Sequence, residues 1–224
     1  MFLPLYDHNP RTHVRRQYVT WSLILLNVMV FLVLEAGGEA RSVTAAAFGF
    51  GAIPALFGTD ALSGGGYLTL VSYAFVHGDL WHLAGNMLFL WVFGDNVEDA
   101  MGHWTFLVFY LLCAVAAALL HIAMLSTSAA PMIGASGAVA GIVAAYLMLH
   151  PHVRIWVLVL GRIPLRLRAY WVLGAWIAFQ VFMVFQTDSG GVAWWSHIGG
   201  LAAGAVPVVF MRRPGVPLFD RARR

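Results

Sequence analysis

The chain has 224 residues, of which 61% are hydrophobic and only 10% are charged, and its mean hydropathy is +0.79. A soluble domain carries about 25% charged residues. This composition cannot cover a water-facing surface, so it excludes an ordinary soluble protein and indicates a polytopic membrane protein. The net charge of +3 comes from arginines gathered in a few loops rather than on a nucleic-acid-binding face, and the single Cys113 excludes a disulfide within the chain.

Six apolar stretches predict a compact bundle of six transmembrane helices, an all-α membrane protein. In chain order they are Tyr18–Leu34, Leu80–Val97, Trp104–Leu125, Ile133–Leu149, Tyr170–Gln186 and Trp194–Met211. Each is close to the roughly 17–25 residues that a spanning helix needs. The first has no adjoining cleavage site and is predicted as a retained helix rather than a signal peptide. A further apolar stretch, Ile155–Leu160, is too short to span, and we expect it in a loop on the membrane surface.

The arginines predict the orientation of the bundle. They precede the first helix, fill the connection between the fourth and fifth helices, and follow the sixth. With six spans these segments share one side, which the positive-inside rule makes cytoplasmic. We therefore expect a cytoplasmic segment over 1–17, a membrane domain over 18–211 and a basic cytoplasmic tail over 212–224. The long outer connection, 35–79, is too apolar for a solvated loop and is predicted to be partly buried, with short helices.

Four polar residues fall at one depth in this topology. The second, fourth and sixth helices all run from the outer side inward. His82 and Asn86 lie near the start of the second helix, Ser136 at the start of the fourth and His197 at the start of the sixth. All four are therefore expected near the outer face, although more than a hundred residues separate the first from the last.

These residue types fit nucleophilic catalysis. A serine needs a base to become nucleophilic, and His197 is the residue type that serves Ser136 in this way. His82 and Asn86 are four residues apart, hence on one face of a helix, and both can donate hydrogen bonds. Together with the Ser136 backbone N–H they predict an oxyanion hole.

Small residues would let the fourth and sixth helices approach closely enough to join serine and histidine. Glycines spaced by three or four positions have this effect in membrane bundles. The glycines concerned are Gly134, Gly137 and Gly141 near the fourth helix, and Gly199, Gly200 and Gly204 on the sixth.

Other readings compete with catalysis. A glycine–serine run in an apolar helix is usually packing, and a lone histidine in a membrane helix is more often structural or part of an ion pathway. Without catalysis, the chain could be a protein that binds transmembrane helices. A transporter or channel would spread its polar groups through the bilayer, whereas here they gather at one end.

The sequence also argues against other protease mechanisms. It has no His-Glu-x-x-His motif and no zinc-spaced cysteine–histidine cluster, so we expect neither a metal nor another cofactor. No paired intramembrane aspartates are evident. Asp79 and Asp188 lie on the expected side, but the spacing of neither places it on His197, so a third triad member stays unassigned.

Four ordered motifs resemble the bacterial-type members of the rhomboid family of intramembrane serine proteases, over about residues 18–211. The motifs are Phe75–Met87 (FVHGDLWHLAGNM), Phe93–Gly102 (FGDNVEDAMG), Gly134–Gly137 (GASG) and Ala193–Gly200 (AWWSHIGG). The resemblance implies Ser136 as nucleophile, His197 as base, His82 and Asn86 as oxyanion donors, and a catalytic dyad without an acid.

The resemblance further implies a substrate class and its route to the site. It implies cleavage of single-span membrane proteins near the outer face of a bacterial cytoplasmic membrane, so the partners would be substrate transmembrane helices and the bilayer, with no nucleic acid. Substrates would pass sideways between the second and fifth helices, gated by Trp176, Phe179, Phe182 and Phe185. The turn that holds Glu98 and Gly102 would be structural.

Two positions depart from the family pattern. Many members carry an aromatic residue four positions after the serine, where it stacks on the catalytic histidine, and here this position is Ala140. Ser196 stands where the family usually has alanine. Neither change removes a catalytic group. Without an aromatic residue at position 140, however, no residue is assigned to support the His197 ring.

Overall fold

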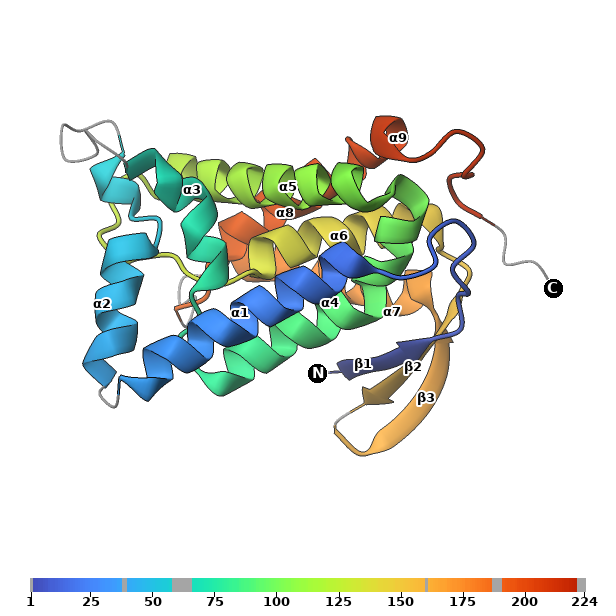
Figure 1. Cartoon of the computed structure of the whole chain (residues 1–224), viewed down its shortest axis with the longest axis horizontal. Coiled ribbons are helices and arrows are strands. Elements are labelled where there is room, and N and C mark those ends of the chain that lie inside the picture. The colour runs from blue at the N-terminus through green and yellow to red at the C-terminus, as the bar shows by residue number, and fades with distance from the viewer. Residues whose placement is uncertain (1, 38–39, 58–65, 160, 187–190, 221–224) are drawn as a thin grey trace.

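The computed structural model describes residues 2–37, 40–57, 66–159, 161–186 and 191–220 (Figure 1). Helices form at all six predicted stretches: α1 (Tyr18–Ala36), α4 (Leu80–Met101), α5 (His103–Met124), α6 (Ser136–Leu149), α7 (Ala169–Val184) and α8 (Trp194–Ala205), which is followed by α9 (Val208–Met211). In the described part of the chain, three segments are long and apolar enough to cross a membrane: Tyr18–Ala36, His103–Met124 and Trp194–Met211. The predicted helical membrane fold is confirmed.

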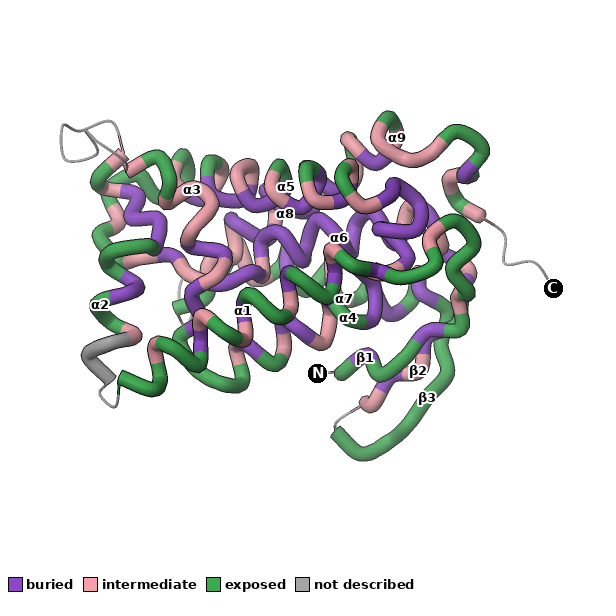
Figure 2. Tube along the Cα trace, viewed as in Figure 1, coloured by how far each residue is buried: buried purple, intermediate pink, exposed green. Residues whose placement is uncertain are grey.

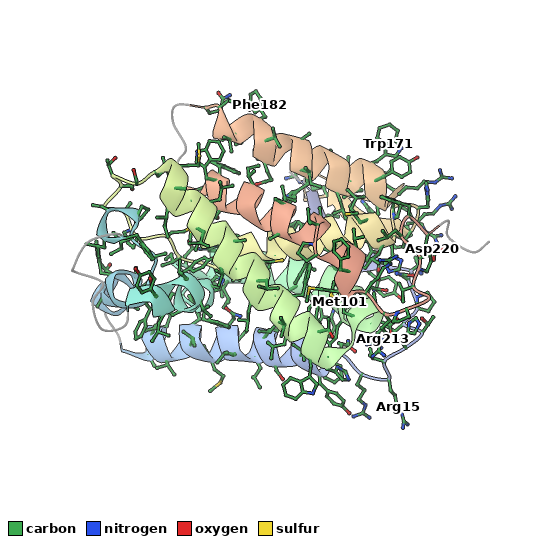
Figure 3. All side chains as sticks on the ribbon, turned by 90° about the horizontal axis from the view of Figure 1, so that it is seen from above. Arg15, Met101, Trp171, Phe182, Arg213 and Asp220 are labelled. Carbon is green, nitrogen blue, oxygen red and sulfur yellow. The ribbon has the colours of Figure 1, made fainter. Side chains whose placement is uncertain are left out.

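Helix α6 is the centre of the bundle. Eleven of its fourteen residues are buried, and it packs against α4, α5 and α8 (Figure 2). Helices α1 and α7 lie at opposite edges of the bundle, and the α7 side chains Trp171 and Phe182 point outward (Figure 3). Because α6 is enclosed by its neighbours, a polar group on it is shielded from lipid.

Helices α6 and α8 approach closely enough for backbone contact. A side-chain carbon at Gly200 would overlap the carbonyl oxygen of Gly137, and one at Gly204 would overlap that of Gly141. Gly199 differs from the expectation, because it faces Ala116 and Ala117 of α5.

The long connection between α1 and α4 contains short helices, as predicted. They are α2 (Ala40–Phe50), η1 (Pro54–Leu56), η3 (Gly66–Leu68), α3 (Thr69–Ser72) and η4 (Tyr73–Phe75). Residues 58–65 lie outside the described part. The segment is held to the bundle at Tyr73, which is buried and donates its hydroxyl hydrogen bond to the Ala114 carbonyl of α5 at 2.8 Å.

A small antiparallel sheet corrects one expectation. The stretch predicted as a surface loop forms β2 (Arg154–Val159), between β1 (Phe2–Asp7) and β3 (Ile163–Arg168); residue 160 lies outside the described part. Apolar residues pair across β2 and β3, for example Val157 with Leu165. Successive side chains of a strand point to opposite faces, and by its length a six-residue apolar stretch fits either a strand or a loop. The third strand comes from the distant N-terminal segment.

Acidic residues at the end of α4 hold the segment that precedes α1. Asp99 accepts hydrogen bonds from the backbone N–H groups of Thr12, His13 and Val14. Glu98 is fully buried and accepts from the N–H groups of Val19 and Thr20. Carboxylates at a helix N-terminus satisfy its free N–H groups and its dipole, so Glu98 stabilises the start of α1, and Asp99 anchors the segment before it.

The C-terminal segment returns to the same end of the bundle. Arg213 donates its backbone N–H to Ala100 of α4, and Phe219 and Asp220 donate theirs to the end of α6. The labelled residues Arg15, Arg213 and Asp220 all lie at this end (Figure 3). The described parts of 1–17 and 212–220 are therefore packed on the bundle, and the predicted domain limits stay predictions.

Candidate active site

Ser136 is the first residue of α6, and a tight turn immediately precedes it. Gly134 has φ +106°, a backbone conformation that L side chains rarely adopt. The chain can therefore reverse sharply before the helix begins, which leaves the Ser136 side chain at an end of the bundle. Gly134 thus belongs to this turn and not to the contact between α6 and α8.

Serine and histidine meet across the glycine contact. The Oγ atom of Ser136 lies 2.9 Å from Nε2 of His197, a hydrogen-bonding distance. His197 is in the first turn of α8 and is only 7% exposed. Because Gly200 allows α8 to touch the backbone of α6 near Gly137, the two side chains can reach each other.

The His197 ring is supported from α7 and from its own helix. The Trp176 ring stacks on it at a centroid distance of 6.4 Å and an interplanar angle of 29°, and Trp194 contacts it edge-on at 5.6 Å. The Oε1 atom of Gln180 lies 2.8 Å from Nδ1 of His197. Trp176, Trp194 and Gln180 therefore support the His197 ring, for which Ala140 offers no aromatic face.

Gln180 was missed by reasoning from the sequence. The available signal was a lone amide in an apolar helix, since an intramembrane polar residue is expensive unless it has a partner. Its spacing of four from Trp176 also places both on one face of α7. Neither signal identifies His197 as the partner of Gln180, because only the tertiary structure brings α7 and α8 together.

His82 lies against the turn that leads to Ser136. A side-chain carbon at Gly134 would collide with the His82 ring. Asn86 follows one turn along α4, is buried, and donates one amide hydrogen to the His82 carbonyl at 3.0 Å. Both side chains lie toward the end of α4 that is next to the turn.

His77 also supports this turn, and sequence reasoning had not assigned it to the site. The backbone N–H of Ala135 donates to Nε2 of His77 at 3.4 Å, and the His77 ring packs edge-on against His82 at 5.1 Å. Burial lowers the pKa of His77 to about 4. The ring is therefore neutral at physiological pH and can accept the Ala135 hydrogen bond.

Neither aspartate considered as a third triad member is seen at His197. Asp79 caps α4 instead, because its Oδ1 atom accepts the backbone N–H of His82 at 2.8 Å. Asp188 lies outside the described residues.

The aromatic residues named as a gate divide between two environments. Trp176 contacts Phe89 of α4 at 5.7 Å, and Phe179 contacts Trp194 at 5.8 Å. Phe182 and Phe185 are 59% and 76% exposed at the outer edge of α7. The contact between Phe89 and Trp176 thus links α4 and α7 directly beside His197.

These observations define an integral membrane protein with a partly buried serine–histidine pair between two closely packed helices. Residues 64–214 match the family model described as "Rhomboid domain". The chain therefore belongs to the rhomboid family, as the ordered motifs predicted.

Curated relatives come from bacteria and from mitochondria. The chain is 30% identical over 149 residues to "Rhomboid protein 1, mitochondrial" of Saccharomyces cerevisiae, covering 62% of this chain and 40% of that protein. It is 33% identical over 129 residues to "Rhomboid protease GluP" of Bacillus subtilis, covering 57% of this chain and 24% of that protein. A plant relative, "RHOMBOID-like protein 12, mitochondrial" of Arabidopsis thaliana, is 26% identical, with coverage of 69% and 49%. The chain thus spans less than half the length of these relatives.

Proposed function

We propose that this protein is an intramembrane serine endopeptidase in which Ser136 is the nucleophile and His197 the base. The observation that carries the proposal is the 2.9 Å contact between Ser136 Oγ and Nε2 of the buried His197 ring. Membership of a family that includes a relative named as a protease supports it.

The reaction would proceed by acyl transfer. His197 takes the Ser136 hydroxyl proton as Oγ attacks the scissile carbonyl carbon, and it then gives this proton to the leaving amine. Water, deprotonated by the same ring, attacks the resulting ester, and the proton returns to Ser136 Oγ as the acid product leaves. His82, Asn86 and the Ser136 backbone N–H would stabilise the negative charge on the carbonyl oxygen.

The proposed substrates are single-span membrane proteins cut near the outer face. The arginine distribution supports an arrangement with both termini in the cytoplasm, which puts the site at the opposite end of the bundle. A bacterial cytoplasmic membrane is the proposed location. A substrate helix would approach between α4 and α7, where Phe89 meets Trp176.

The test is cleavage of a single-span substrate by detergent-purified protein, together with labelling of Ser136 by a fluorophosphonate probe. We expect Ser136→Ala to abolish both and His197→Ala to reduce cleavage by several orders of magnitude. Replacing either His82 or Asn86 by alanine should lower kcat by about 10²–10³-fold if each donates to the oxyanion. Cleavage that survives Ser136→Ala would refute the proposal. An unlabelled Ser136 in folded protein would instead favour a silent protein that binds transmembrane helices.

A further inference from the structure

Gln180 is a buried polar side chain on α7, a helix whose other buried residues are all apolar. It is 3% exposed, and its two amide atoms have different partners. The Nε2 atom donates to the backbone carbonyl of Trp176 at 3.2 Å, and Oε1 lies 2.8 Å from Nδ1 of His197.

These two contacts determine the proton position on His197. A backbone carbonyl can only accept, so the amide nitrogen of Gln180 must face Trp176 and the amide oxygen must face His197. That oxygen can also only accept, so Nδ1 of His197 must carry the hydrogen. In the neutral ring Nε2 is then the unprotonated atom, which is the atom that faces Ser136 Oγ.

We propose that Gln180 is a positioning residue that holds His197 in the tautomer able to accept the Ser136 proton. This inference rests on the proposed function, since it assigns Gln180 the orienting part that a carboxylate has in a soluble serine protease. A neutral amide fits this environment because an unpaired carboxylate inside a membrane protein is costly. Unlike a carboxylate, Gln180 orients the ring without adding charge to stabilise the imidazolium.

The location of Gln180 ties the base to the docking of α7. The helix lies at the edge of the bundle and buries only Ala169, Val172, Leu173 and Gln180 (Figure 3). An outward movement of α7 would carry Oε1 away from Nδ1 and withdraw Trp176 from the ring. The contacts of Gln180 and Trp176 with the His197 ring therefore exist only while α7 is docked.

The experiment compares Gln180→Leu, Gln180→Glu and a control, Gly174→Ala. Leucine keeps the approximate size and removes the acceptor, whereas glutamate keeps an acceptor and adds charge. Gly174 lies on the same helix, and its added side-chain carbon would meet no described atom within 4 Å apart from its chain neighbours and the nearby backbone of its own helix. The readouts are kcat and KM on a single-span substrate, and fluorophosphonate labelling of Ser136 from pH 5 to 9.

We expect Gln180→Leu to lower kcat by about 10- to 100-fold with little change in KM, a part of what general-base catalysis contributes. Gln180→Glu should recover part of kcat and move the acid limb of Ser136 labelling to higher pH, because a carboxylate stabilises the protonated ring. An unchanged kcat in Gln180→Leu, or an unmoved acid limb in Gln180→Glu, would overturn the proposal. If Gln180→Leu fails to fold, the position of the acid limb of Ser136 labelling in Gln180→Glu is the deciding measurement.

A failure of the role assigned to Gln180 can be distinguished from a failure of the proposed function. Cleavage abolished by Ser136→Ala but unaffected by Gln180→Leu would remove only the part assigned to Gln180. Cleavage that persists in Ser136→Ala would remove the protease assignment itself.

A second, independent feature lies at the other end of the molecule, on the β2–β3 hairpin. Arg154 pairs directly with Arg168, and Arg166 pairs with Trp156. Residues that pair across strands, and residues two apart along a strand, share one face of a sheet. Three arginines therefore lie on one face, although like charges placed directly opposite each other are destabilising.

These arginines line a cavity of about 1170 Å³ between the sheet, the N-terminal segment and the C-terminal segment. Among the described residues, none of the three arginines has a carboxylate within ion-pairing distance. Asp99 and Asp220 also line the cavity, but Asp99 is already bound by three backbone N–H groups. The cavity thus has an excess of positive charge.

The opposite face of the hairpin is apolar; its β2 half, with Ile155 and Val157, is buried in the core, and its β3 half is exposed. Ile163, Leu165 and Leu167 on β3 are 51%, 39% and 37% exposed. A ribbon with arginines on one face and exposed aliphatic side chains on the other suits the boundary between acyl chains and headgroups. We propose that the cavity binds the phosphate of an anionic phospholipid headgroup.

The test measures the apparent Kd of detergent-purified protein for short-chain phosphatidylglycerol, with phosphatidylcholine and inorganic phosphate as separate probes. The variants are Arg154→Gln and Arg168→Gln, and the control is Arg162→Gln, in the turn that joins the strands. Each cavity substitution should weaken phosphatidylglycerol binding about fivefold, the effect of one basic residue near an anionic surface, and the control should not. Equal weakening by Arg162→Gln would overturn the site, and inorganic phosphate binding as tightly as phosphatidylglycerol would overturn the lipid assignment.

Discussion

At the scale of single residues, the candidate site depends on a position where a larger side chain would not fit. Gly134 combines a positive φ with direct contact to the His82 ring. The same turn is held by His77 through the Ala135 backbone. The approach to Ser136 is therefore constrained from two sides, by backbone conformation and by the neighbouring imidazole.

Gly134→Ala is expected to impair both stability and the site. The left-handed conformation costs an alanine about 1–3 kcal/mol, and the new methyl group must also displace the His82 ring. Fluorophosphonate labelling of Ser136 should fall at least about tenfold if the oxyanion geometry is lost, since one such donor is worth about 10²–10³ in kcat. Gly85→Ala on α4 is the control, because its added carbon would meet no described atom within 4 Å apart from its chain neighbours and the nearby backbone of its own helix. Normal labelling and stability in Gly134→Ala would contradict this account of the turn.

At the scale of elements, the pairing of α6 with α8 is what joins the proposed nucleophile to the proposed base. Two glycines of α8, Gly200 and Gly204, touch backbone carbonyls of α6. Without a hydrophobic driving force between helices in lipid, close van der Waals packing is a principal source of their association. The contact that stabilises the bundle is therefore the same one that sets the distance between Ser136 and His197.

Gly204→Ala tests this coupling two turns away from the chemistry. Its methyl group would overlap the Gly141 backbone, which cannot move aside as a flexible side chain could. Overpacking of this kind typically costs about 1–3 kcal/mol, so we expect a lower thermal midpoint in detergent and weaker Ser136 labelling. Gly174→Ala on α7 should leave both unchanged. A loss of stability with full labelling would mean that the α8 backbone adapts without separating the pair.

At the scale of the whole molecule, the described N-terminal and C-terminal segments are packed on one end of the bundle. Asp7 of β1 is buried and accepts hydrogen bonds from the Tyr146 hydroxyl of α6 at 2.6 Å and from Asn96 of α4 at 3.1 Å. This contact joins the sheet to the central helix. Burial raises the pKa of Asp7 to about 7, above its usual value of 3.8.

The raised pKa of Asp7 predicts how stability varies with pH. Between about pH 4 and pH 7 the folded protein retains a proton on Asp7 that the unfolded chain has lost. The contribution of Asp7 to the free energy of unfolding therefore falls as pH rises through this range, by at most about 1.4 kcal/mol per pH unit, and is level above pH 7. Asp7→Asn should remove this slope while keeping an acceptor for Tyr146.

The measurement is denaturant unfolding in detergent from pH 4.5 to 8, and the decisive quantity is the difference between wild type and Asp7→Asn at each pH. Glu35→Gln, an exposed change at the opposite end of the bundle, is the control. Parallel pH curves for wild type and Asp7→Asn would show that Asp7 does not retain its proton.

Local patterns predicted the helices well and the connections less well. Long apolar stretches and arginine-rich loops act over a single element, so all six helices were found in the right places. The β2 strand was missed because a stretch of six apolar residues fits either a loop or a strand, and its partner β1 lies some 150 residues earlier in the sequence. Helices α6 and α7 are also shorter than predicted, with α6 beginning at Ser136 rather than at residue 133.

The sequence by itself determined that the chain is a helical membrane protein of a recognisable family, and that Ser136, His197, His82 and Asn86 lie toward one end of their helices. These properties follow from composition, span length and ordered motifs, which are local. The tertiary structure decided which side chains meet: it joined Ser136 to His197, supplied Gln180 and Trp176 where Ala140 offers no support, and moved Gly134 from helix packing to a turn. Such contacts depend on the relative rotation and separation of helices distant in the chain, which no periodicity within one helix specifies.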